Sequence, residues 1–287
     1  MSEPTSRAGA AAIGRFLEIQ NLGLNLPFAL AFLVLASGGV PSLDKLVWIV
    51  IAFVAARNAG HSFNRWADRT LDARNPRTAN RALVTGRISP RFALAFALAN
   101  AGVLVVAAYL LSPLAFVLAP VAIALVFGYS YTKRYTSATT AVLGLVEAVT
   151  PAAIYIAVVG TLPPAVLLAV GGMLCWGTAF ETIHSLGDLE SDRAEGLRSI
   201  PVRFGVSVSL RLVVALHATA LVLLAAFGGA LHLAYPYYVA LVAMAVVAAW
   251  GDWELARHPT ATRPIFERHF LSSALYLAGV LVAIFAV

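Results

Sequence analysis

The sequence predicts an all-α protein that crosses a membrane several times, with nine transmembrane helices. Of its 287 residues, 60% are hydrophobic and 12% are charged, and the mean hydropathy is +0.84. Soluble domains contain roughly 45–50% apolar residues, so lipid is the expected solvent for this chain. Polar residues also divide the chain into apolar segments of about 17–25 residues, long enough to span the hydrocarbon core as helices.

Nine such segments follow one another along the chain. We expect helices near 20–38, 45–66, 91–111, 114–131, 139–159, 163–186, 207–230, 234–251 and 269–287. The break between the third and fourth segments rests on one Ser-Pro, and the eighth segment is short, so eight helices is the alternative. Residues 1–15 are small and polar and predict a disordered N-terminus without a cleaved signal peptide. Residues 16–287 predict a single transmembrane domain.

Basic residues lie almost entirely on one side of this predicted topology. Nineteen of the twenty Lys and Arg residues fall in the N-terminus or in alternate connections, and Lys45 alone falls on the other side. Cytoplasmic loops carry an excess of Lys and Arg. We therefore expect a multi-pass protein of the cell membrane with its N-terminus and polar loops in the cytoplasm and its C-terminus outside. The placement of the basic residues says more about topology than the net charge of +6 does. We expect no nucleic-acid partner and no obligate protein partner.

Two acidic groups lie at the polar ends of even-numbered helices. Asn64, Asp68 and Asp72 are four residues apart, a spacing that places them along one helical face. Asp188 and Asp192 repeat this spacing at an offset of 120 residues (188 − 68). The match would suit two parallel repeats about an axis along the membrane normal.

The chemistry of these side chains favours a hard cation. Oxygen ligands without cysteine suit Mg²⁺, which typically uses one or two carboxylates together with phosphate oxygens. Two facing acidic groups would therefore hold a diphosphate through Mg²⁺, with Asn64, Asp68, Asp72, Asp188 and Asp192 as the metal ligands. For one group alone, the alternative is a solvated helix end with salt bridges to neighbouring arginines. Two groups on the same side favour a functional site, because ionisable residues are costly at a membrane.

Cations near the acidic groups are candidates for binding a diphosphate. Arg57 lies inside an apolar helix, about two turns before the first acidic group, where an unpaired charge is costly. Lys133 and Arg134 form a turn on the same side, and Arg198 follows the second acidic group by six residues. Converging cations would stabilise a departing diphosphate. The alternative for Lys133 and Arg134 is a pair that only sets the topology. Three further arginines are interpreted as loop charges: Arg77, Arg81 and Arg87.

Aromatic and polar side chains near the same helix ends are weaker candidates for contacts with an acceptor or a carbocation. Tyr129 and Tyr131 would attract a cation through their ring faces, although tyrosines also form interfacial belts. Asn21 and Asn25 in the first helix are each either a substrate contact or an interhelical hydrogen bond. His184, one turn before Asp188, completes this set.

Four stretches of the sequence together carry a resemblance to a known family. They are the Asn-x3-Asp-x3-Asp of 64–72 followed by NPRTANR, the Asp-x3-Asp of 188–192 followed by RSIPVRFG, the turn YSYTKRYT, and LPFALAF in the first helix. Over about residues 15–287 the chain resembles the UbiA superfamily of intramembrane prenyltransferases, and most closely its 4-hydroxybenzoate polyprenyltransferase group. It departs from many relatives at Arg65, where they carry Asp, and at Asn21, where they carry His.

The resemblance implies a nine-helix fold around a central cavity with a polar cap on the cytoplasmic side. It implies Mg²⁺-dependent transfer of a prenyl chain from an isoprenyl diphosphate, held in membrane lipid, to an aromatic acceptor such as 4-hydroxybenzoate, in quinone biosynthesis. The catalytic residues would be Asn64, Asp68 and Asp188. The diphosphate contacts would be Arg57, Lys133, Arg134 and Arg198.

Other functions are weighed against this one. The lipid-ether branch of the same superfamily prenylates geranylgeranylglyceryl phosphate. A secondary transporter would use the acidic groups as ion sites, but such sites lie at the bilayer midplane, whereas these groups lie at helix ends beside basic loops. A CDP-alcohol phosphotransferase also carries Asp-x3-Asp on a membrane helix, but the Asp-Gly-x2-Ala-Arg that should precede it is absent from this sequence.

Overall fold

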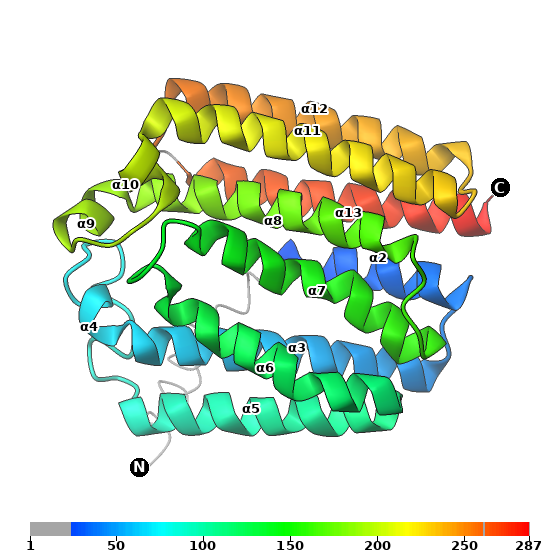
Figure 1. Ribbon diagram of the computed structural model, residues 1–287, viewed down its shortest axis with the longest axis horizontal. Helices are drawn as coiled ribbons and strands as arrows, with labels where there is room; N and C mark the ends of the chain where they lie inside the picture. The colour runs from blue at the N-terminus through cyan, green and yellow to red at the C-terminus, as the bar shows by residue number, and fades with distance from the viewer. Residues whose placement is uncertain (1–23, 261, 287) are drawn as a thin grey trace, which may run out of the picture.

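The computed structural model describes residues 24–260 and 262–286, and all regular structure in this part of the chain is helical (Figure 1). The expected disorder of residues 1–15 lies outside the described residues. The long helices are α2 (Leu26–Ser37), α3 (Leu43–Ala67), α5 (Pro90–Leu111), α6 (Pro113–Thr132), α7 (Thr139–Val159), α8 (Val166–Gly187), α11 (Val206–Ala230), α12 (Tyr235–Arg257) and α13 (Arg263–Phe285). The short ones are α4 (Arg69–Asp72), α9 (Leu189–Ala194) and α10 (Ile200–Phe204).

The expected all-helical membrane fold is confirmed. Eight of the long helices are long and apolar enough to cross a membrane, and α2 has 12 described residues. The Ser-Pro break is a true helix boundary: Ser112 accepts a hydrogen bond at Oγ from the Ala115 amide at 3.1 Å, which caps α6, and Pro113 suits the first helical position. The chain is therefore a multi-pass membrane protein in which α5 and α6 are separate helices.

Six of the long helices pack around a closed circuit. Along it, α2 contacts α7, α7 contacts α8, α8 contacts α11, α11 contacts α12, α12 contacts α13, and α13 returns to α2. Large aromatic side chains fill the interior, among them Phe28, Trp176 and Tyr276. The remaining long helices, α3, α5 and α6, pack on one another beside α7 (Figure 1).

Glycines set the close approach of α7 and α8. A Cβ on Gly144 of α7 would lie 2.7 Å from the Thr178 amide nitrogen and 2.9 Å from the Leu174 carbonyl oxygen, both in α8. A Cβ on Gly177 of α8 would lie 2.6 Å from Oε2 of Glu147 in α7. Small residues allow helix backbones to approach closely in membranes, and here they bring a carboxylate of α7 against α8.

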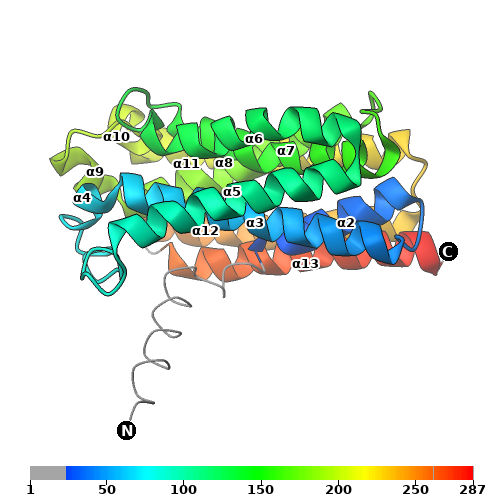
Figure 2. The same cartoon turned by 90° about the horizontal axis from the view of Figure 1, so that it is seen from below.

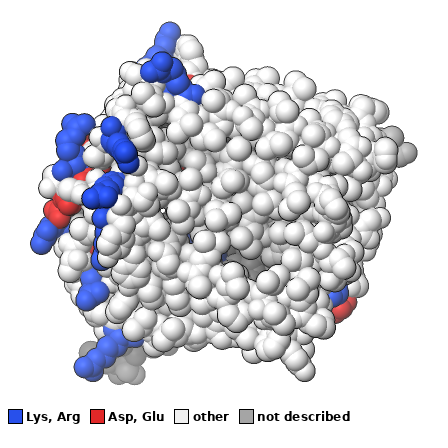
Figure 3. All heavy atoms as spheres, viewed as in Figure 1, with Lys and Arg blue, Asp and Glu red and all other residues white. Residues whose placement is uncertain are grey.

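The two ends of the bundle differ in charge. The short helices α4, α9 and α10 gather at one end (Figure 2), where most of the Lys and Arg side chains lie, while the opposite end carries only a small charged patch on this face (Figure 3). At that opposite end, Lys45 donates hydrogen bonds to the carbonyls of Leu111 and Ala157, at 2.7 and 2.8 Å, near the C-terminal ends of α5 and α7. A cation is favoured there by the helix dipoles.

Candidate functional site

The two acidic groups occupy equivalent junctions in the backbone. Asp68 joins α3 to α4 with φ −95° and ψ 7°, and Asp188 joins α8 to α9 with φ −102° and ψ 3°. Helical hydrogen bonding continues across both junctions, because the amide of Asp72 donates to the Asp68 carbonyl and that of Asp192 to the Asp188 carbonyl, each at 2.8 Å. The offset of 120 residues therefore relates two similar local structures at the same end of the bundle.

Asp68 is held by neighbours from two directions. The residue is 3% exposed, and its carboxylate accepts a hydrogen bond from Nδ2 of Asn64 at 3.0 Å. Arg134 donates from Nη2 to the other oxygen at 2.9 Å, and Lys133 Nζ lies 3.9 Å from the carboxylate. The predicted cationic turn thus meets the first acidic group, across 66 residues of sequence.

Asp72 and Asp188 are paired with arginines that the sequence interpretation assigned to loop charge. Arg81 Nη1 lies 2.7 Å from both carboxylate oxygens of Asp72. Arg77 makes a two-point contact with Asp188, at 2.8 Å from Nε and 2.6 Å from Nη2. That interpretation is wrong for Arg77 and Arg81, because the loop after α4 folds back over the acidic groups. Among the described residues, the guanidinium of Arg87 bonds atoms of its own loop, namely Oγ1 of Thr85 and the Asn80 carbonyl.

The same loop joins the two acidic groups to each other. Asn75, three residues after Asp72, donates from Nδ2 to Asp188 at 3.2 Å. Burial by itself would raise the pKa of Asp188, but the hydrogen bonds and charge of Arg77 outweigh it, and the pKa lies below its usual value. Asp188 is therefore an anion held at the centre of this end of the bundle.

Asp192 has a different environment. It is 6% exposed, and burial raises its pKa to about 6, while Lys133 opposes that rise and the nearby Asp188 adds to it. Lys133 thus has carboxylates of both acidic groups within its electrostatic range. Because Lys133 is shared between the two acidic groups, an anion bound there would also contact its ammonium group.

The other predicted cations are Arg57 and Arg198. Arg57 is half-buried in α3, seven residues before Asn64. Arg198 is exposed, and its guanidinium donates to the Tyr135 carbonyl at 2.7 Å, while its amide donates to the Lys133 carbonyl at the same distance. Arg198 therefore braces the turn that carries Lys133 rather than contacting an acidic residue.

Aromatic rings of α3 and α6 cluster beside Arg134, which bonds Asp68. Phe63 stacks on Phe127 at 4.2 Å between ring centroids and meets Tyr131 edge-on at 6.1 Å. Arg134 lies over the Tyr131 ring at 5.1 Å. Tyr129 lies within electrostatic range of Asp68 and of Glu181. The predicted Asn21 lies outside the described residues.

Two carboxylates of the spanning helices were not among the predicted site residues. Glu181 of α8 lies 3.9 Å from Nδ1 of His184, one turn before Asp188, and Glu147 of α7 lies deeper in the bundle. Ionisable residues within apolar spans are the signal that would have found them, because such residues are rare unless they serve a site.

The donor set fits Mg²⁺ bound jointly with a phosphate. In the described ranges, no group of three His, Cys, Asp or Glu side chains converges as a complete metal site. Mg²⁺ does not need one, since it commonly takes one or two carboxylates and completes its shell with phosphate oxygens and water. Asp68 with Asn64, and Asp188 with Asp192, supply such carboxylates beside several cations.

Comparison with known proteins decides the family. The model of the UbiA prenyltransferase family matches residues 25–286. The chain belongs to this family. As a UbiA family member it is a prenyltransferase, and the resemblance carried by its sequence motifs is confirmed.

Curated UbiA relatives are similar over most of their length. A 4-hydroxybenzoate octaprenyltransferase of Saccharophagus degradans is 31% identical over 250 residues, 86% of this chain and 83% of the relative. A protein of the same name from Nitrosomonas eutropha is 32% identical over 251 residues, 86% of each chain.

Solved structures show the same fold. The apo structure of a UbiA homologue from Aeropyrum pernix K1 superposes with a TM-score of 0.83 at 29% identity, covering 92% of this chain and 98% of the homologue. A UbiA homologue from Archaeoglobus fulgidus bound to GPP and Mg²⁺ has a TM-score of 0.75 at 19% identity, covering 95% of this chain and 99% of the homologue.

Proposed function

We propose that this prenyltransferase moves a prenyl chain from an isoprenyl diphosphate to an aromatic acceptor such as 4-hydroxybenzoate, with Mg²⁺, in quinone biosynthesis. The observation that carries the proposal is the meeting of the two acidic groups with Lys133, Arg134 and Arg77 at one end of an apolar bundle. Two curated relatives, about a third identical along most of the chain, bear the name of this activity.

The acidic groups would hold the metal and the cations would hold the diphosphate. Asn64, Asp68, Asp72, Asp188 and Asp192 are the proposed metal ligands, and Mg²⁺ would neutralise the diphosphate and so make it a better leaving group. Lys133 and Arg134 already lie at Asp68, where their charges would stabilise the negative charge that grows on the departing diphosphate.

Arg77 has a further part in this proposal. Its two bonds to Asp188 occupy the oxygens that a metal would use, so ligand binding at Asp188 should move the guanidinium toward the phosphate oxygens. Arginine suits both partners, because its planar fork matches carboxylate and phosphate alike.

The aromatic rings would protect the reacting carbon. When the allylic C–O bond breaks, its electron pair leaves with the diphosphate and a carbocation remains at the prenyl carbon. The ring faces of Tyr131 and Phe63, which cluster next to the Arg134–Asp68 pair, would attract that cation and exclude water. The acceptor ring then bonds to the prenyl carbon, and its ring proton passes to a base, for which Asp68 and Asp188 are the nearest proposed groups.

The membrane geometry suits a lipid substrate. We propose that the charged end of the bundle faces the cytoplasm, in line with the distribution of basic residues, and that the C-terminus lies outside. The prenyl tail would then remain among the apolar helices while its diphosphate meets the charged end.

A radiolabelled transfer assay tests the proposal. Purified protein is given labelled isoprenyl diphosphate, Mg²⁺ and either 4-hydroxybenzoate or geranylgeranylglyceryl phosphate. We expect labelled prenylated 4-hydroxybenzoate, no product after chelation with EDTA, and none from the Asp68→Ala/Asp192→Ala double variant. Product from the glycerol phosphate alone would move the chain to the lipid-ether branch. Full transfer by the double variant would refute the proposed metal site.

A further inference from the structure

A second polar system lies deeper in the bundle than the acidic groups. Glu147 stands in the middle of the spanning helix α7 and faces Gly177 of α8. Eleven residues separate Gly177 from Asp188, so Glu147 lies about 16 Å further along α8 from the charged end. A carboxylate at this depth is energetically costly, and such residues typically mark functional sites.

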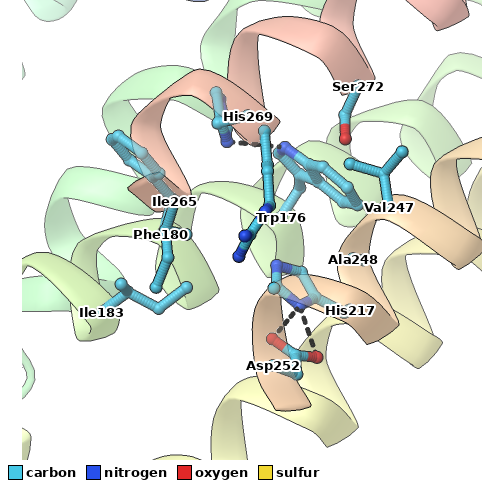
Figure 4. A pocket seen from close by; sticks show the side chains of 12 residues that line it. Trp176, Phe180, Ile183, His217, Val247, Ala248, Asp252, Ile265, His269 and Ser272 are labelled. Atoms are coloured by element: carbon cyan, nitrogen blue, oxygen red, sulfur yellow. Dashed lines mark hydrogen bonds and ion pairs between the residues drawn. The ribbon is translucent and has the colours of Figure 1, made fainter. Parts of the chain in front are cut away.

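A chain of hydrogen bonds with a defined donor direction holds Glu147, and its other members come from α8, α13 and the residue that precedes α2. The Trp176 indole of α8 donates to Nδ1 of His269 in α13 at 3.1 Å (Figure 4). An indole nitrogen can only donate, so His269 carries its proton on Nε2 and donates it to Oδ1 of Asn25, the N-cap residue of α2, at 3.1 Å. The amide of Asn25 is thereby oriented, and its Nδ2 donates to Oε1 of Glu147 at 3.0 Å.

This chain leaves one carboxylate oxygen for another molecule. Oε2 of Glu147 is buried and has no hydrogen-bond partner among the described residues, although the residue as a whole is only half-buried. An ionised carboxylate accepts hydrogen bonds at both oxygens. A buried acceptor without a partner costs about 1–3 kcal/mol, so its presence needs an explanation.

Acidic side chains continue from Glu147 to the proposed diphosphate site. Glu181 lies one turn beyond Gly177 on α8, and Asp188 lies two turns further, so they fall on one face of the helix. Glu181 is within electrostatic range of both Glu147 and Asp188. Glu147 is therefore the inner end of the polar row whose outer end we propose to bind metal and diphosphate.

We propose that Glu147 recognises the hydroxyl group of the aromatic acceptor, which donates a hydrogen bond to Oε2. This inference deepens the proposed function and rests on it. The acceptor ring would lie between Glu147 and the diphosphate, with its hydroxyl toward the bilayer centre. An anionic substituent of the acceptor must point the other way, toward Lys133 and Arg134, because a second negative charge beside Glu147 would be repelled.

Asn25, His269 and Trp176 act as positioning residues in this arrangement. They do not touch the acceptor, but they fix which oxygen of Glu147 is free and where it points. A site built to bond a hydroxyl rejects an analogue that lacks the proton, because its own polar group is then left unpaired.

The experiment compares two ligands that differ in that proton. Dissociation constants of 4-hydroxybenzoate and 4-methoxybenzoate are measured on the full chain, with Mg²⁺ and an unreactive isoprenyl thiolodiphosphate present. A hydrogen bond to a charged group predicts that wild type binds the hydroxyl ligand at least about tenfold more tightly. In Glu147→Leu the two constants should become equal, while the affinity for the thiolodiphosphate stays within about twofold of wild type.

Two further variants test the interpretation, and a third serves as a control. Glu147→Gln keeps the volume and the bond from Asn25, but its free amide donates to hydroxyl and methoxy oxygens alike, so the preference should disappear here too. Asn25→Leu should reduce the preference several-fold without changing thiolodiphosphate affinity. Thr182→Val is the matched control. Its buried hydroxyl bonds the Thr178 carbonyl of its own helix at 2.7 Å and no other group in the described part of the chain, so the preference should remain.

The outcomes separate this inference from the proposed function. Prenyl transfer to 4-hydroxybenzoate by wild type, together with an undiminished hydroxyl preference in Glu147→Leu or Glu147→Gln, overturns the role of Glu147 alone. Equal binding of the two ligands by wild type also overturns it. A wild type that neither binds nor prenylates a hydroxyaromatic compound overturns the proposed acceptor class as well.

Discussion

Replacing Gly144 with alanine should separate α7 from α8. The added Cβ would lie 2.7 Å from the Thr178 amide nitrogen and 2.9 Å from the Leu174 carbonyl oxygen. Ordinary contacts of a carbon atom are about 3.5 Å or longer, so the helices must move apart by roughly 0.6–0.8 Å. Both atoms belong to the backbone of α8, and no side-chain rotation can relieve the overlap.

The expected loss of stability follows from two opposing terms. Overpacking a tight interface costs about 1–3 kcal/mol, and the upper end applies because backbone must move. Alanine recovers about 1 kcal/mol through its higher helix propensity. Gly144→Ala should therefore destabilise the protein by about 2 kcal/mol. The same substitution at Gly102 in α5, where a Cβ meets nothing within 4 Å, should be stabilising by up to about 1 kcal/mol.

Thermal unfolding in one detergent, at one scan rate, measures the difference between these two variants. Gly144→Ala should unfold several degrees below wild type and Gly102→Ala at or above it. Prenyl transfer by Gly144→Ala should also fall, because Glu147 and Glu181 lie on the α7–α8 side of the bundle. An unfolding midpoint for Gly144→Ala at or above that of Gly102→Ala would refute the close packing of these helices.

Further predictions concern the charged end. Asp68→Ala and Asp192→Ala should each lower prenyl transfer at least about a hundredfold in the radiolabel assay, since each removes a proposed metal ligand; near-normal transfer by either contradicts its assignment. Arg77→Gln should weaken binding of the isoprenyl diphosphate about tenfold or more, because the two-point charged contact is lost. Arg87→Gln, a change of the same kind in the same loop, should bind normally, and equal losses in both variants would count against a specific role. Burial raises the pKa of Asp192 to about 6, and only its ionised form can hold a cation. The kcat/KM for isoprenyl diphosphate should therefore fall as the pH decreases through about 6, and a flat profile down to pH 5 would contradict this.

Properties set by neighbouring residues were predictable. Runs of apolar residues and the punctuation between them placed most helix ends within three residues of their observed positions, as at Ser112, where a single Ser-Pro separates α5 from α6. The exceptions among the described residues are α2, which begins at Leu26 rather than near 20, α12, which continues to Arg257 rather than ending near 251, and α13, which begins at Arg263 rather than near 269. The spacing of Asp68 and Asp72, repeated at Asp188 and Asp192, was also visible because it is local.

Properties that depend on loop paths were less predictable. Arg134 was expected near the acidic groups and is there, but Arg198 braces the turn instead. Arg77 and Arg81 looked like loop charges, and their contacts with carboxylates depend on how the loop after α4 folds back. Charge and spacing alone do not tell an anchoring arginine from a site arginine, because both follow a membrane helix on the cytoplasmic side.

The sequence by itself determined that this chain is a helical membrane protein with two matched acidic groups at one end, because hydropathy and i, i+4 spacing act over a few residues. The tertiary structure alone decided which side chains meet. Arg77 reaches Asp188 across 111 residues, Asn25 reaches Glu147 across 122, and His269 reaches Asn25 across 244. Such contacts depend on which helices become neighbours, and that order comes from the packing of glycines and large aromatic residues over the whole bundle, which no local pattern records.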